Sequence, residues 1–160
     1  MTRVSSIVPP ADTRDLLPSA SFADSFVIEV DDTSLDAMTA ARRMFGEFPG
    51  WIRRLLALRD ALVTPFGVMT STQIRQSARR RIGTFPLLSE SPGRVVVGAD
   101  DKHLNFVGVV DVISGGGAAP RVVLTTLVDT HNLLGRVYLS IVMPFHRVIA
   151  PALLKRLARA

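Results

Sequence analysis

The sequence contains no cysteine among its 160 residues. This absence excludes disulfide bonds, thiol nucleophiles and zinc sites built from thiolates, and it fits a reducing compartment. Aromatic residues are also few, with one tryptophan and one tyrosine beside eight phenylalanines. Hydrophobic residues nevertheless make up 48% of the chain, enough to form a core. We therefore expect a cytoplasmic protein whose length suits one folded domain.

Long hydrophobic runs are missing as well. No extended apolar core follows the first basic residue, so the N-terminus does not resemble a signal peptide. The longest apolar run of the last segment, 137–145, is interrupted by Ser140 and Pro144. A membrane span needs ~20 predominantly apolar residues. We therefore expect a soluble protein without a membrane span.

The formal net charge is +5, from 19 Lys and Arg against 14 Asp and Glu. Such a balance permits contact with anionic membranes or with nucleic acid. The arginine runs at 53–54 and 79–81 have no interleaved aromatic residues on which bases could stack. Solvated helix faces explain these runs better, and we predict no nucleic-acid partner.

The first half of the chain shows three kinds of pattern. Residues 1–21 contain three prolines and small polar residues, which predicts an irregular N-terminal arm. Residues 22–31 alternate between apolar and polar, as in a half-buried strand. Two helices are expected next, at 33–45 and 51–63, each followed by glycine or proline. Residues 68–83 fit no single pattern.

The second half predicts an antiparallel meander followed by one long helix. Four strands are expected at 85–90, 94–99, 104–114 and 121–130, and the third is apolar on both faces, as in a strand covered on both sides. Residues 130–159 carry apolar side chains at helical spacing. The sequence therefore predicts an α+β fold over residues 22–160, in which a curved antiparallel sheet grips the C-terminal helix, with a cavity between them.

Two stretches resemble a known family. They are GADDKHLNF at 98–106 and TLVDTHNLLGRVYLSIVMPFHRVIAPALLKR at 126–156. They resemble the bacterial DUF2867 family, which implies the helix-grip fold of the Bet v 1-like, START-like (SRPBCC) superfamily. Asn105 and Val107 stand where an acidic residue and an arginine are usual in that family. Some relatives are fused behind a Rossmann domain, which this chain lacks. The resemblance implies a fold and no established activity.

The three histidines are the main candidates for chemistry. His103 lies in a predicted turn beside Asp100 and Asp101. Such a cluster can bind a metal or move a proton, but Asp side chains more often cap a turn. His131 and Asn132 stand where the last strand meets the helix. Asn132 suits an N-cap, and His131 either orients this junction or faces a cavity mouth.

His146 lies on the apolar side of the predicted C-terminal helix, in line with Leu139, Val142 and Leu153. A buried imidazole needs a hydrogen-bond partner. Two interpretations remain: a core histidine bonded to the sheet, which we favour, or a polar anchor inside a ligand cavity. Pro144 and Pro151 should bend or interrupt the same helix.

No catalytic signature is present. The glycines at 115–117 lack the Lys-Ser/Thr of a phosphate-binding loop, and no nucleophile elbow or zinc-protease motif occurs. We predict no catalytic residue, cofactor or metal. The favoured function is a non-catalytic pocket for a small apolar or amphipathic ligand, with five candidate residues: His146, Tyr138, Arg136, His131 and Asn132.

Two alternatives remain open. One is an accessory module that binds a protein partner, for example an oxidoreductase, or forms a homodimer. The other is a cyclase-like or hydrolytic enzyme that uses His131 or His146 as a base. That enzyme would require an acidic side chain within hydrogen-bonding reach in a cleft.

Overall fold

The computed structural model of the chain describes residues 3–66 and 80–159. Its elements, in chain order, are β1 (Ser5–Ile7), α1 (Ala11–Arg14), β2 (Phe22–Glu29), α2 (Ala37–Phe45), α3 (Gly50–Val63), η1 (Thr64–Phe66), β3 (Arg81–Ile82), β4 (Phe85–Glu90), β5 (Arg94–Asp100), β6 (Leu104–Gly115), β7 (Ala118–Thr130), α5 (Leu133–Lys155) and η2 (Leu157–Arg159).

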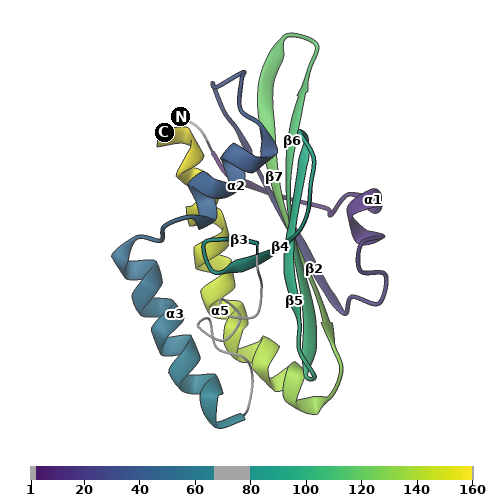
Figure 1. The fold of residues 1–160 in the computed structure, drawn as a ribbon, viewed down its shortest axis with the longest axis vertical. Coiled ribbons are helices and arrows are strands. Elements are labelled where there is room, and N and C mark those ends of the chain that lie inside the picture. Colours follow the sequence, from purple (N-terminus) through teal and green to yellow (C-terminus); the bar gives the residue numbers. More distant parts are fainter. Residues whose placement is uncertain (1–2, 67–79, 160) are drawn as a thin grey trace.

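The strands form one curved antiparallel sheet in the order β1-β2-β7-β6-β5-β4-β3. Helix α5 runs along one face of this sheet, and α3 lies on the same side (Figure 1). The two helices after β2 and the meander β4 to β7 occur where the sequence predicts them. The predicted α+β fold, with a sheet that grips a long C-terminal helix, is confirmed.

The inner face of the sheet carries the main core. Alternation along β2 places Phe26 and Ile28 toward the helices, and the cross-strand partners Leu124 and Val122 on β7 point the same way. Helices α2 and α5 cover these side chains, with Met44 and Leu154 fully buried. The hydrophobic face of the sheet is thus removed from water by the two helices.

The outer face of the sheet carries a second, smaller cluster. Val107 and Val109 of β6 pack there with Leu127 of β7, and Leu17 from the segment after α1 covers them. The prediction that this strand is covered on both sides is therefore confirmed for residues 104–112, whereas Ile113 is exposed. Ser25 and Thr125 are cross-strand partners on this face. Their buried hydroxyl groups form a hydrogen bond of 2.6 Å with each other, so neither is left without a partner.

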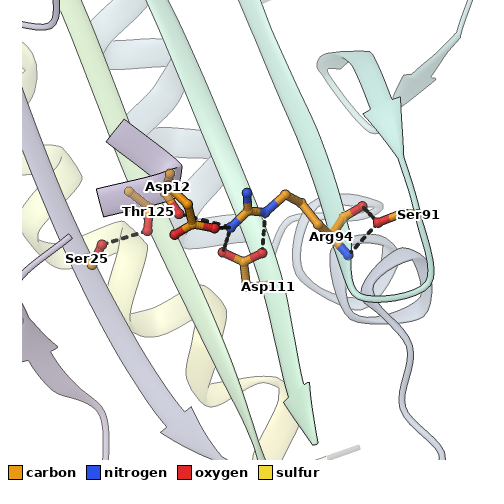
Figure 2. Close-up of polar contacts among 7 residues, drawn as sticks. Asp12, Ser25, Ser91, Arg94, Asp111 and Thr125 are labelled. Atoms are coloured by element: carbon orange, nitrogen blue, oxygen red, sulfur yellow. Dashed lines mark hydrogen bonds and ion pairs between the residues drawn. The ribbon is translucent and has the colours of Figure 1, made fainter. Parts of the chain in front are cut away.

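The N-terminal arm, expected to be irregular, contains two short elements and packs on the sheet. β1 pairs with the edge of β2, and α1 lies on the outer face. Arg94 of β5 holds α1 in place (Figure 2): its guanidinium binds Asp111 at 2.6 and 3.0 Å and donates to Asp12 at 2.8 Å and Thr13 at 3.1 Å. Elements of three and four residues are too short to show periodicity, so only tertiary contacts reveal them.

Two further differences from the sequence expectation concern strands and prolines. The sheet has seven strands where five were predicted, because β1 and the two-residue β3 join its edges. The unassigned stretch 68–83 lies mostly outside the described residues. Helix α5 is continuous through Pro144 and Pro151, so neither proline interrupts it, although its axis bends between its two ends (Figure 1). It begins at Leu133 with Asn132 as its N-cap, as predicted.

Helix α5 and η2 together form a long apolar stretch. Leu133–Arg159 is long and apolar enough, by length and composition alone, to cross a membrane, with a mean hydropathy of 1.6 over its best window. Only 17% of that window is buried inside the protein. Core helices of soluble proteins also meet this criterion, and one side of α5 packs on the sheet through Tyr138 and Leu153.

Candidate functional site

A cavity of about 200 Å³ lies between the inner face of the sheet and helix α5, and we call it the central cavity. Residues of α2, α3 and the segment around β4 close its sides. Its lining is predominantly apolar, with six aromatic side chains: Phe45, Phe48, Phe85, Phe106, Tyr138 and Phe145. Phe85 packs edge-to-face against Phe45 at 5.2 Å and against Phe106 at 6.0 Å between ring centroids.

The sequence explains why space remains here. Gly108 lies between Phe106 and Val110 on the inner face of β6 and lines the central cavity without a side chain. On the opposite wall, α5 contributes a stripe at helical spacing that includes Tyr138, Val142 and His146. At Gly108 the inner face of the sheet therefore presents no side chain to the helix, and space remains there.

Tyr138 and Arg59 form the polar group at one end of this wall. Arg59 Nε donates to Tyr138 Oη at 3.1 Å and a second guanidinium nitrogen donates to the same oxygen, while Nη1 binds Asp60. The guanidinium also lies 5.4 Å from the centroid of the Tyr138 ring. Burial disfavours the charged form of Arg59, but Tyr138 and Asp60 together raise its pKa above the usual value.

His146 and Asp24 form the second polar group. The Nε2 atom of His146 lies 2.9 Å from Asp24 Oδ2 and 3.1 Å from Oδ1, so β2 supplies the partner that a half-buried imidazole requires. Phe22 packs edge-on against the same ring at 6.1 Å. The favoured interpretation, a histidine bonded to the sheet, is therefore confirmed. His146 also lines the central cavity, and its role as a polar anchor for a ligand stays a prediction.

The two polar groups are well separated. Tyr138 and His146 are eight residues apart on α5, which corresponds to about 12 Å along the helix axis. Two side chains at this separation do not act on one bond of a small molecule. The lining between them is apolar, through residues such as Val142 and Phe106.

The other three predicted site residues lie outside the lining of the central cavity. Arg136 is exposed on the outer side of α5. His131 is exposed, and its Nε2 lies 3.9 Å from Asp129 Oδ2. Asn132 caps α5, since its Oδ1 accepts from Gly135 N at 2.9 Å. These residues shape the strand-to-helix junction.

His103 belongs to the same junction. Its Nδ1 lies 3.1 Å from Asn132 Nδ2 and its carbonyl accepts from His131 N at 2.9 Å. Because Asn132 Oδ1 is taken by Gly135, Nδ2 is the donor and His103 Nδ1 the acceptor. Asp101 accepts from Lys102 N, as expected for a carboxylate that caps the turn.

The acid that the enzyme alternative requires is present, because Asp24 lies within hydrogen-bonding reach of His146. Across residues 3–66 and 80–159, no three His, Cys, Asp or Glu side chains gather as metal ligands. The cavity itself offers apolar surface and five polar side chains: Arg59, Thr84, Thr126, Tyr138 and His146. This combination suits binding and orientation of a small molecule.

Sequence reasoning missed Arg59 and Asp24. A signal for each was present. Asp24 has the same strand parity as Phe26 and Ile28, so it faces inward. Arg59 has the helical spacing of Ile52 and Val63, the buried residues of α3. An inward-facing charge on an otherwise apolar stripe indicates a partner across the core.

Comparison with known proteins gives one result. The family described as "Protein of unknown function (DUF2867)" matches residues 16–153. Searches of curated proteins and of solved structures found no match. The matched range includes β2 and the whole of the central cavity lining. The chain therefore belongs to the DUF2867 family.

Proposed function

We propose that the protein is a non-catalytic pocket protein that binds a small amphipathic molecule in the central cavity. The observation that carries this proposal is the cavity of about 200 Å³ between sheet and helix, lined by six aromatic side chains and by His146. A pocket with an apolar wall and few polar groups is the usual form of a small-molecule site.

The volume limits the size of the ligand. An apolar cavity of about 150 Å³ accommodates benzene in a well-studied case. By the same scale, the 200 Å³ of the central cavity hold about eight or nine non-hydrogen atoms. A single ring with a short substituent or a short alkyl chain fits this space, whereas a sterol or a long acyl chain does not.

Tyr138 indicates what polar group the ligand carries. Its Oη accepts two N–H bonds from Arg59, which occupy its lone pairs. Its own hydrogen has no acceptor among the described residues, and the side chain lines the cavity. Donation from a positive guanidinium polarises the phenol O–H and strengthens it as a donor. A ligand with a carbonyl or similar acceptor would satisfy this hydrogen.

The test uses two probes of equal size and shape, acetophenone and α-methylstyrene. They differ only in whether a carbonyl oxygen or a methylene carbon is attached to the same position. By isothermal titration, we expect both to bind the wild-type protein, and acetophenone to bind about tenfold more tightly through the added hydrogen bond. In Tyr138→Phe this preference should fall to nearly one.

Thr126→Val is the matched control, because it removes a different hydroxyl from the same lining. It should keep the wild-type preference for acetophenone. Failure of both probes to bind would refute the pocket function. Equal binding of the two probes to the wild-type protein, or loss of the preference only in Thr126→Val, would refute the role of Tyr138 and leave the pocket intact.

The interaction-module alternative also has structural support. Helix α3 exposes three large apolar side chains, Trp51, Leu58 and Leu62, which favours a binding surface outside the cavity. A protein partner or a homodimer on this surface, with the chain in the cytoplasm, is the second function that we propose to test. Sedimentation equilibrium of the wild-type chain and of Leu58→Ser tests self-association directly. A monomer in both cases would exclude the homodimer.

A further inference from the structure

Helix α3 carries an apolar stripe that no part of the described chain covers. Trp51, Leu58 and Leu62 are 45%, 50% and 44% exposed. Their spacing of seven and four residues places them on one side of the helix. The neighbouring inward stripe, with Ile52 and Val63 buried, is the one that packs on the protein. We call the three exposed residues the α3 stripe.

The helices on this side of the sheet also carry the positive charge of the chain. Helix α3 and the segment 133–159 contain eight basic residues and one acidic residue, a net charge of +7. The chain as a whole is +5, so all its other residues together are −2. The single acid, Asp60, is bound to Arg59. We call α3 and the segment 133–159 together the helix layer. It is basic, and the remaining residues of the chain have a net charge of −2.

Helix α5 lies on the same side of the sheet as α3 (Figure 1) and also has exposed apolar side chains. Leu133, Val137 and Val148 are exposed on it, and the apolar stretch that begins at Leu133 is mostly unburied. The exposed basic residues Arg136 and Arg147 accompany them. Exposed apolar side chains flanked by arginine, with a tryptophan among them, are the composition of helices that lie in a membrane interface.

We propose that the helix layer docks on the surface of an anionic lipid bilayer, with the α3 stripe inserted at the headgroup boundary. Arg54, which flanks the stripe at helical spacing, and the exposed Arg147 of α5 would then lie against lipid phosphates. Nucleic acid would match the charge but leave the three apolar side chains in water. A bilayer surface removes apolar area from water and neutralises the arginines together. This proposal does not depend on the central cavity.

The geometry favours docking over spanning. The inner side of α5 packs on the sheet through Tyr138, Leu153 and Leu154, which are all buried. Inserting α5 across a bilayer would separate it from the sheet and expose the core. Lying on the surface keeps the fold intact and uses only side chains that are already exposed.

The experiment is co-sedimentation of the full chain with lipid vesicles. One set contains phosphatidylcholine alone, and the other contains equal parts of phosphatidylcholine and phosphatidylglycerol. We expect binding to the anionic vesicles and weak binding to the neutral ones. The double variant Arg54→Glu, Arg147→Glu should bind anionic vesicles at least about thirtyfold more weakly, since each arginine near such a surface contributes about 1 kcal/mol. Trp51→Ser with Leu58→Ser should also weaken binding.

Matched control variants lie on the sheet, away from the helix layer. Arg121→Glu reverses an exposed arginine of β7, and Leu88→Ser removes a 56% exposed leucine of β4. Both should bind as the wild type does, and circular dichroism should show all variants folded. Acetophenone binding by the Arg54→Glu, Arg147→Glu variant should be unchanged, because neither residue lines the central cavity. This result separates the vesicle test from that of the pocket.

Three results would overturn the proposal. The first is equal binding to neutral and anionic vesicles, or no binding to either. The second is a dimer of the wild-type chain that Trp51→Ser dissociates, which would assign the α3 stripe to a second copy. The third is vesicle binding that high salt and alkaline carbonate do not reverse, which would indicate a spanning helix instead of a docked one.

Discussion

His146 Nε2 lies 2.9 Å from Asp24 Oδ2, and this contact joins the middle of α5 to the first long strand of the sheet. Both side chains are mostly buried, at 16% and 21% exposure. The contact spans 122 residues of sequence and lies at the margin of the central cavity. One hydrogen bond therefore fixes the helix against the sheet and orients the only histidine that lines the cavity.

Removing the carboxylate should cost stability because it leaves the imidazole without a partner. We expect Asp24→Ala to lower the free energy of unfolding by about 1–3 kcal/mol. Urea denaturation of the variant and the wild type measures this difference. Asp31→Ala, at an exposed acid just after the same strand, is the control and should change stability little. Equal effects of the two substitutions would show that the contact contributes nothing.

The N-cap of α5 gives a second prediction. Asn132 Oδ1 accepts from Gly135 N at 2.9 Å, so Asn132→Ala leaves an N–H of the first turn unsatisfied. The free energy of unfolding should fall by about 1 kcal/mol. Asn132→Ser restores a capping oxygen and should recover most of the loss in the same urea titration. If serine is no better than alanine, the stabilising contact of Asn132 is the one with His103 instead.

A third prediction concerns close approach at the same junction. A Cβ atom on Gly135 would lie 2.1 Å from the carbonyl oxygen of His103, a distance that requires backbone movement. Gly135→Ala should therefore destabilise the protein by about 1–3 kcal/mol through overpacking. Gly50 in the first turn of α3 has no atom within 4 Å of such a Cβ. Gly50→Ala should be neutral or slightly stabilising, and thermal melting of both variants compares them.

The contact between Arg94 and Asp12, which holds the N-terminal arm on the sheet, should weaken at low pH. The hydrogen bond from Arg94 holds the pKa of Asp12 below its ordinary value of 3.8. A carboxylate with a lowered folded-state pKa contributes stability above its unfolded pKa and loses it as the pH falls through the lower value. Amide hydrogen exchange in α1 should therefore accelerate, relative to the core strands, once the pH falls below about 3.8.

Arg94→Gln provides the comparison. Without the guanidinium, α1 should exchange rapidly at neutral pH, and its exchange should lose the acid-dependent step that Asp12 causes. Because Asp111 also binds Arg94, the variant Asp12→Asn is needed to assign the step. A step that persists in Asp12→Asn would show that Asp12 does not cause it.

The sequence predicted the fold better than the site, for a physical reason. Periodicity reports which side of a long element is buried, and α5, β2 and the strands from β4 to β7 are long enough to show it. The tethering of α1 by Arg94 and the partner of His146 are pairings between distant segments, and no local pattern encodes them. Tyr138 and His146 could be selected because they lie on an apolar stripe. Arg136 lies on the opposite side of the helix. Its spacing alone did not show whether it faces solvent or lies at the rim of the cavity.

A cavity-filling substitution provides the last prediction. Val142 lies on α5 between Tyr138 and His146, lines the central cavity and is partly buried. If the cavity is empty space of about 200 Å³, Val142→Phe places a larger apolar side chain into it without forcing the neighbours apart. The melting temperature should then rise by a few degrees, since about 1 kcal/mol of added apolar burial shifts it by this much for a chain of this size. Binding of acetophenone and α-methylstyrene should disappear together.

Val148→Phe, at an exposed position of the same helix, is the control and should leave both stability and probe binding unchanged. A fall in melting temperature for Val142→Phe would mean that this wall of the cavity is already close-packed, and the ligand site would then have to lie elsewhere.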